Sequence, residues 1–422
     1  MDQNNGFGDK TLIRLAVLRA ILKSPIFLLA ILWSSYACSG QYQAGYAKAE
    51  ITPKIGDKVG SITGRLVSVK DIYDPLFVKA LTITDGASTV AIVVVDVISL
   101  SQNNIDAILH ELRDERGFDH VILAVSHTHR GMLLPRAMKK IERTVVDTVV
   151  ASRADIEAVE IGAGQIEIDE AYNRIIRKKD SIEMLWTNPQ RVPNRYVDNS
   201  LGVIHLRKMD GAPFFTLLNY TAHPVVTMDI NNTVISGDYP NALINELNQT
   251  LGGESMFLIG ASGDVNPYDA GTTPAELALP KAQRLGEKLA EAAAKSVMEI
   301  DSYTSEGKLR YHTKDFRNPD TEIGVLMLAP DIAMATFPGE YFNAFGVELK
   351  KNSPAMNTFF VGKANGAINY VPTVSALSFG GYGAEKDRAK FAEAGYKHID
   401  FAVGAIKDLL KETEQSQTEK SK

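Results

Sequence analysis

The chain has 422 residues, of which 45% are hydrophobic and 23% charged, with 45 Lys and Arg residues against 51 Asp and Glu, a formal net charge of −6 and one cysteine. This composition excludes disordered and collagen-like chains, and a single thiol cannot form an internal disulfide. A mildly acidic chain without a basic block offers little to neutralise phosphates, so nucleic acid is not an expected partner.

The first forty residues are predicted to be a targeting segment. A basic leader precedes a short apolar run at residues 25–33, which is too short for a stable membrane span and typical of a signal peptide. The stretch that follows resembles a bacterial lipoprotein cleavage box, in which Cys38 becomes the lipid-carrying N-terminus; a simple signal peptide or a buried thiol is the alternative. We therefore predict a signal peptide at 1–37 and an exported, periplasmic or outer-membrane lipoprotein whose acyl group tethers it to a membrane.

Strand and helix patterns alternate through the rest of the chain, which predicts one mixed α/β domain over residues 38–410. Residues 89–100 and 120–125 are apolar, β-branched runs typical of strands buried on both faces, and a helix is expected between them at 104–116. Residues 201–207 and 213–219 flank an Asp-Gly turn, which predicts a hairpin.

Later segments follow the same alternation. Apolar residues at three- and four-residue spacing predict amphipathic helices at 241–251, 280–298 and 398–410. The polar stretch 411–422 has nothing apolar to bury and is predicted to be a disordered tail.

Polar residues gather just after the predicted strands. These positions include His127, His129, His223, Asn266, Glu340 and Tyr370. In open α/β sheets ligands bind beyond the carboxyl ends of the strands, so this distribution predicts one functional edge if the strands are largely parallel.

The His127-Thr128-His129 segment is the sharpest local feature. In an extended segment residues i and i+2 project to one side, so both imidazoles can serve one centre, and catalytic zinc takes His and carboxylate ligands with one position open for water. Taken singly, each residue has a plainer explanation. The pair and His223 could be ordinary histidines, and Glu340 could favour the start of a helix expected at 340–349.

Several motifs occur together in the order and context of the neutral/alkaline (non-lysosomal) ceramidase family, and the chain resembles that family from about residue 46 to residue 382. The motifs are Ser126-His127-Thr128-His129, Asn173-Arg174, Ala222-His223, Ser236-Gly237-Asp238, Gly263-Asp264-Val265, Pro338-Gly339-Glu340 and Asn369-Tyr370-Val371-Pro372-Thr373. The resemblance implies a zinc amidohydrolase that cleaves the N-acyl amide of a ceramide-like lipid with zinc-activated water.

The resemblance also implies residue roles. The zinc ligands are then His127, His223, Glu340 and Tyr370. His129, Arg174 and Tyr382, which lies twelve residues after Tyr370, would contact the substrate carbonyl or its oxyanion. A cationic or hydroxyl donor lowers the barrier most where negative charge develops, so this set is chemically coherent.

The chain departs from the family pattern in three places. Asn266 replaces the family serine, which excludes serine-based covalent chemistry there and leaves Asn266 to hold the amide or the attacking water. Arg130 stands where the family has a small residue and is expected to add a bulky cation beside the mouth of the site. Few residues follow Tyr382, so the C-terminal β-sandwich domain of larger members is not expected.

Three aspartates are weaker candidates. Asp264 and Asp238, each after a glycine, are expected either to orient a ligand or to stabilise turns, and Asp96 at a strand end is a further candidate. Two other functions stay open: a zinc hydrolase of another amide or ester, and a non-catalytic lipid- or glycan-binding surface lipoprotein.

Overall fold

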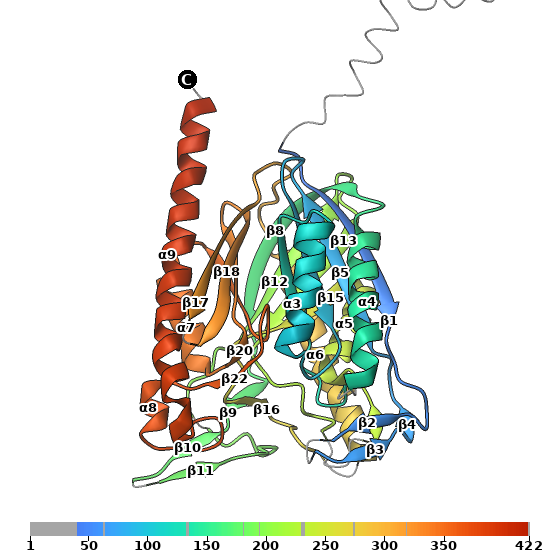
Figure 1. The fold of residues 1–422 in the computed structure, drawn as a ribbon, viewed down its shortest axis with the longest axis vertical. Helices are drawn as coiled ribbons and strands as arrows, with labels where there is room; N and C mark the ends of the chain where they lie inside the picture. The colour runs from blue at the N-terminus through green and yellow to red at the C-terminus, as the bar shows by residue number, and fades with distance from the viewer. Residues whose placement is uncertain are drawn as a thin grey trace, which may run out of the picture. The chain divides into compact units, whose positions relative to one another are not determined.

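Two β-sheets pack face to face, and helices cover the outer face of each (Figure 1). The computed structural model describes residues 40–61, 64–131, 135–179, 181–193, 195–228, 233–272, 275–317 and 319–420. The predicted signal peptide and Cys38 lie outside these residues. Within these ranges, no helix combines the length and the apolar character that a membrane crossing requires.

The larger sheet has eight strands in the order β15-β13-β12-β8-β1-β5-β6-β7. They are β1 (Gln43–Glu50), β5 (Phe77–Thr84), β6 (Thr89–Val95), β7 (His120–Val125), β8 (Glu157–Glu167), β12 (Ser200–Lys208), β13 (Pro213–Tyr220) and β15 (Glu254–Ile259). Only the β6/β7 and β13/β15 pairs are parallel, so the sheet is mixed rather than largely parallel. The predicted hairpin is confirmed as the antiparallel β12/β13 pair.

The smaller sheet has four strands in the order β17-β18-β19-β21. These are β17 (Arg310–Arg317), β18 (Asp320–Ala329), β19 (Ile332–Thr336) and β21 (Asn357–Val361). Short two-stranded pairs complete the β structure: β2 (Lys58–Gly60) with β3 (Leu66–Ser68), β4 (Asp71–Ile72) with β14 (Val234–Ile235), β9 (Ala171–Asn173) with β16 (Val265–Pro267), β10 (Ile175–Arg177) with β11 (Ile182–Met184), and β20 (Gly339–Tyr341) with β22 (Ile368–Val371).

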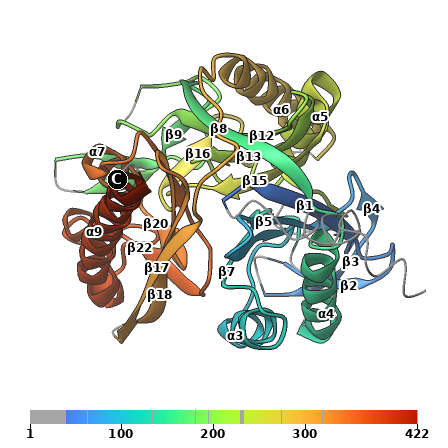
Figure 2. The same ribbon diagram turned by 90° about the horizontal axis from the view of Figure 1, so that it is seen from above.

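Helices form the two outer layers, as the view from above shows (Figure 2). The eight-stranded sheet is covered by α3 (Gln102–His110), α4 (Pro135–Ser152), α5 (Asp238–Leu251) and α6 (Ala275–Met298). The four-stranded sheet is covered by α7 (Asn343–Asn352) and α9 (Ala389–Lys420), with the one-turn helix α8 (Val374–Leu377) nearby. The architecture is therefore a four-layer αββα sandwich, which confirms the predicted mixed α/β class.

Strand β6 shows why the central strands are apolar throughout. Its alternate residues Ile92 and Val94 face the second sheet, whereas Val93 and Val95 face α3 and α4. Successive side chains point to opposite faces of a sheet, so a strand covered on both sides must be apolar at every position.

Sheet twist brings distant strand ends together. Neighbouring strands rotate by roughly 20–25°, which over a wide sheet turns the edge strands by a large angle relative to each other. The loop after β21 joins the two edges: the Gly362 amide donates to the Ile259 carbonyl at 2.8 Å, and the Asn365 amide donates to the Leu123 carbonyl at 2.9 Å. The ends of β15 and β7 therefore lie beside one loop although their sheet is not parallel.

Two expected elements differ from the structure. Glu340 lies in the short strand β20, and the helix that was expected to begin there begins at Asn343 as α7. Helix α9 extends to Lys420, so the prediction of a disordered tail from Lys411 is wrong for most of that segment. The buried Thr413 accepts a hydrogen bond from Arg310 at 2.8 Å, which ties this part of the helix to β17.

Three buried histidines remote from the strand-end loops predict acid sensitivity. Burial lowers the pKa of His120, His205 and His398 to about 4, against about 6.5 in an unfolded chain. Between these values the unfolded chain binds more protons, so stability is fully present above about pH 6.5 and falls as the pH is lowered toward 4. We expect urea unfolding to show this loss, and the His205→Gln variant to show a shallower pH dependence; an unchanged slope would contradict the assignment.

Candidate metal centre

His127 and His129 lie in the loop that follows β7. His127 adopts a left-handed backbone conformation with φ 65°, which L-residues other than glycine adopt rarely. Its Nδ1 lies 2.7 Å from the carbonyl oxygen of Ile98, so Nδ1 carries the proton and Nε2 is left as a lone-pair donor. The hydroxyl of Thr128 between them donates to the Ser236 carbonyl at 2.7 Å, which fixes the loop.

His223 follows β13 and is oriented in the same way. Its Nδ1 lies 3.1 Å from the carbonyl oxygen of Val265, and its Nε2 lies 3.2 Å from Oε2 of Glu340. Metal-binding histidines are typically oriented by such a hydrogen bond from the second ring nitrogen, which fixes the tautomer. Both His127 and His223 therefore present Nε2 to a common point.

Glu340 reaches that point from the four-stranded side of the molecule. It lies in β20, which runs parallel to β22 so that Glu340 and Tyr370 are paired across the two strands. The distance from its Oε2 to Nε2 of His127 is 3.5 Å. Burial alone would raise the pKa of Glu340, but His127 and the Lys363 ammonium hold it well below its usual value, so the carboxylate is ionised.

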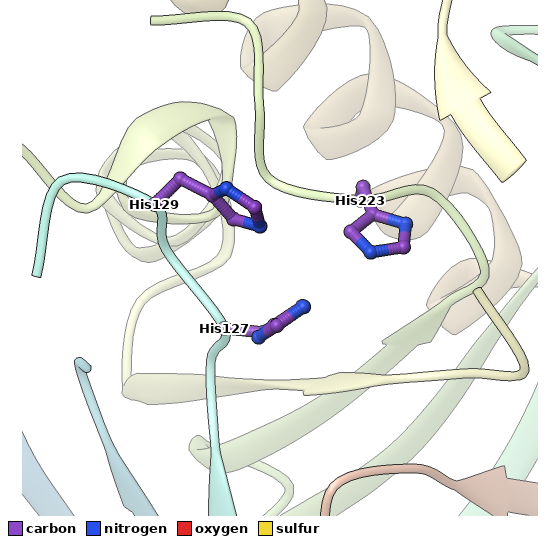
Figure 3. Close-up of side chains that lie close together, drawn as sticks. All are labelled: His127, His129 and His223. Carbon is purple, nitrogen blue, oxygen red and sulfur yellow. The ribbon is translucent and has the colours of Figure 1, made fainter. Parts of the chain in front are cut away.

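The three imidazoles converge, as Figure 3 shows. One ring nitrogen from each of His127, His129 and His223 lies within 4.8 Å of the other two, and the rings come from two loops far apart in the sequence. Burial lowers the pKa of His223 to about 4 and that of His129 well below 6.5, with the neighbouring imidazoles lowering it further. His129 and His223 are therefore neutral at physiological pH, which is the state that binds a metal.

The unpaired nitrogens in this cluster fit a divalent cation. Among the described residues, Nε2 of His127 and both ring nitrogens of His129 are buried without a hydrogen-bond partner. Two ligands of a tetrahedral zinc, each about 2.0–2.1 Å from the ion, lie about 3.4 Å apart, close to the 3.2 and 3.5 Å that separate Glu340 Oε2 from His223 and His127. An ion would satisfy atoms that are otherwise costly to bury.

A cavity of about 470 Å³ opens onto the cluster. Its lining includes His127, His129, Glu340, Tyr370 and Tyr382. Burial, and Glu340 next to it, raise the pKa of the Tyr370 hydroxyl well above 10, so it is neutral without a metal. The structure thus brings all four predicted zinc ligands to one place, while their roles as ligands stay a prediction.

Arg174 lies beside the cluster within a group of aromatic rings. Its guanidinium carbon is 5.2 Å from the ring centroid of Tyr382, 5.4 Å from that of Trp186 and 5.6 Å from that of Tyr370. The side chain is buried, one of its nitrogens donates to the Gly263 carbonyl at 2.7 Å, and Nε has no partner among the described residues. Arg174 is thus a buried cation whose Nε–H group has no acceptor among the described residues, and an oxyanion-binding group requires such a donor.

Comparisons with solved structures identify the fold. No protein-family description and no curated protein matches the chain. A solved structure described as "Ceramidase complexed with C2" superposes on this chain with a TM-score of 0.71 at 15% sequence identity. The superposition covers 86% of this chain and 75% of the ceramidase chain. A neutral ceramidase from Pseudomonas aeruginosa gives the same TM-score and identity, covering 87% of this chain and 75% of its own. The chain has a neutral ceramidase-like fold.

Asn266 occupies a buried position in β16 of this ceramidase-like fold. Its Nδ2 donates to the Trp186 carbonyl at 3.2 Å, and its Oδ1 has no partner among the described residues. Trp186 is thereby held next to Tyr382, with ring centroids 5.3 Å apart. Asn266 therefore helps to position the aromatic group around Arg174, and a direct contact with substrate stays a prediction.

The three aspartates form hydrogen bonds or ion pairs that stabilise the structure around the site. Asp264 accepts hydrogen bonds from Asn173 Nδ2 at 2.6 Å and from the Asn343 amide at 2.7 Å, which joins β9 to the start of α7. Asp238 accepts the Thr227 amide at 2.7 Å and so fixes the turn after His223. Asp96 forms a buried ion pair with Lys79 at 2.7 Å. These contacts favour the turn-stabilising explanation over direct orientation of a ligand.

Arg130 differs from its expected position. It was expected to stand beside the mouth of the site, but it is only 1% exposed and its Nε donates to the carbonyl of Thr227. Arg130 therefore supports the loops that carry the histidines and does not line the cavity.

Two site residues were not predicted from the sequence. Lys363 lines the cavity with its ammonium 3.6 Å from Oε1 of Glu340, and Trp186 packs against Arg174 and Tyr382. Lys363 stands just after β21, so the strand-end position that indicated the histidines would also have indicated this lysine. Trp186 follows a short hairpin, and no comparable sequence pattern indicated that it belongs to the site.

Proposed function

We propose that the chain is a zinc-dependent hydrolase that cleaves an N-acyl amide of a lipid-like substrate. The observation that carries the proposal is the convergence of three buried histidines and the Glu340 carboxylate beside a cavity, with several histidine nitrogens that have no hydrogen-bond partner among the described residues. The ceramidase-like fold supports the reaction class, and the structural neighbour bound to C2 is itself a ceramidase. We also propose, from the sequence, that the protein is exported and anchored through Cys38.

In the proposed reaction, the oxygen of water bonds to the amide carbonyl carbon and the carbon–nitrogen bond breaks as the amine takes up a proton. A divalent ion, when bound, supplies a Lewis acid that lowers the pKa of water toward neutrality. Arg174 would donate to the carbonyl oxygen as it gains negative charge, together with Tyr382, whose ring lies beside its guanidinium. His129, whose ring nitrogens have no hydrogen-bond partner among the described residues, would hold the proton in transit, which leaves the ion to His127, His223, Glu340 and Tyr370.

Metal analysis joined to a hydrolysis assay tests the proposal. We expect purified residues 39–422 to contain about one zinc ion per chain, to release fatty acid from N-acyl amides, and to lose that activity with a chelator and regain it with added zinc. Protein without stoichiometric metal would support a non-catalytic lipid- or glycan-binding role. A strict preference for the matched ester would reassign the enzyme to the second candidate, a zinc esterase.

A further inference from the structure

Lys363 is held in an unusual backbone position at the end of β21. Its φ is 53°, in the left-handed region that residues with a Cβ adopt rarely. Its amide donates to the Gly339 carbonyl at 3.3 Å, while the adjacent Gly362 amide donates to Ile259. The loop thus connects the end of β15 with β20, and it fixes the lysine directly beside Glu340.

The ammonium of Lys363 has donors left for a ligand. Among the residues that the structure describes, its only polar contact is Oε1 of Glu340 at 3.6 Å, which is longer than a hydrogen bond. The side chain is 9% exposed, and it faces the cavity that also contains His127 and His129. An ammonium carries three donors and is expensive to bury unless it is paired.

The cavity around it is polar. Its lining is Ile98, Ser99, His127, His129, Glu340, Lys363, Asn369, Tyr370, Tyr382, Gly383, Glu385, Asp387 and Arg388. Ile98 is the only aliphatic side chain in this set. Glu385 and Asp387 are exposed at the mouth, and Glu385 already accepts the Gly383 amide at 3.1 Å. The positive charge buried beside Glu340 is therefore that of Lys363, and Arg388 is a second cation in the lining.

We propose that Lys363 binds an anionic group of the substrate, so that the preferred substrate is an N-acyl amide bearing a carboxylate close to the scissile bond. This inference rests on the proposed function and names its substrate class. Among the described residues that line this cavity, a molecule with two long alkyl chains finds few apolar walls, whereas a carboxylate finds an ammonium that is held in place with no hydrogen-bond partner among them. Lys363 acts as a specificity-determining residue.

Two probes that differ in one charged group test this assignment. N-octanoylglycine carries the carboxylate, and N-octanoylethanolamine is its neutral counterpart of similar length. With the full-length zinc-loaded protein we expect kcat/KM to be about tenfold or more higher for N-octanoylglycine, since a hydrogen bond to a charged group is worth about that factor. In Lys363→Met this preference should disappear, and in Lys363→Arg most of it should return.

Lys386 provides the matched control, since it is an exposed lysine near the mouth that does not line the cavity. Lys386→Met should keep the preference of the wild type. Equal rates on both probes in the wild type, or an equal loss on both in Lys363→Met, would overturn the assignment.

Calorimetry on the metal-free full-length protein gives a second readout that does not depend on turnover. We expect N-octanoylglycine to bind about tenfold more weakly to Lys363→Met than to the wild type. If neither probe is hydrolysed but this difference in binding is seen, the anion site stands and the proposed hydrolase activity fails. If binding does not differ between the two proteins, the anion site fails.

Discussion

Replacing His223 with alanine is expected to remove most of the bound zinc and to lower hydrolysis by at least about a hundredfold, because loss of an outer partner alone typically costs about 10–100-fold. His223 is fully buried, and its Nε2 lies 3.2 Å from Glu340. The variant removes a predicted ligand nitrogen and also leaves the ionised Glu340 with one partner fewer in a low-dielectric site. Zinc content per chain, measured on folded protein, checks the first effect, and fatty-acid release checks the second.

A buried histidine elsewhere separates metal loss from general damage. His205 lies in β12, is also buried, and contacts the Thr216 hydroxyl at 2.9 Å. His205→Ala removes a similar volume from the interior, so it should lower stability to a comparable degree while zinc remains bound. A His223→Ala protein that keeps its full zinc content would exclude this centre.

Sequence patterns predicted where the strands and their polar ends lie, but they did not predict how the strands are arranged in the sheet. The periodicity of residues 120–125 gave β7 with its correct bounds, because a strand buried on both faces must be apolar throughout. The shared functional edge was inferred from parallel strands, but the sheet is mixed. Twist and the loop after β21 bring the ends of β7 and β15 together, and neither leaves a local pattern in the sequence.

The position of Glu340 is a second case in which a local sequence pattern did not predict a structure that depends on distant residues. Its neighbours favoured a helix start, whereas pairing of Glu340 with Tyr370 across β20 and β22 places it in a strand. This pairing joins segments about thirty residues apart, and non-local contacts of this kind override local propensity. The order of motifs along the chain nevertheless indicated the same set of residues that the structure brings together.

Two residues of the site, Asn266 and Lys363, bear on the proposed reaction and on its substrate. Asn266 cannot act as the nucleophile that a serine could supply, which agrees with the proposed attack by water. Lys363 adds a positive charge next to the Glu340 carboxylate, which shifts the cavity toward anionic ligands. Both residues are consistent with the proposed hydrolysis of a polar amide by water.

Arg174→Met is expected to lower kcat by about 10²–10³-fold, the usual cost of losing one donor to an oxyanion. Methionine preserves much of the apolar stem that packs among Trp186, Tyr370 and Tyr382, but it removes the charge. Zinc content should stay at the wild-type level, because the guanidinium is not among the groups that converge on the ion site. Steady-state kinetics with one N-acyl amide, together with metal analysis, measure both.

Arg177 is a nearby arginine, in β10, that allows a matched substitution. Its guanidinium carbon lies 3.8 Å from the ring centroid of Phe379, and the side chain is exposed, away from the cavity lining. Arg177→Met removes the same charge from the same hairpin, so a general effect of positive charge on binding would appear in both variants. A loss of kcat confined to Arg174→Met locates the effect at the reacting carbonyl. An equal loss in both, or an unchanged kcat in Arg174→Met, would mean that transition-state charge is stabilised by another group in the cavity.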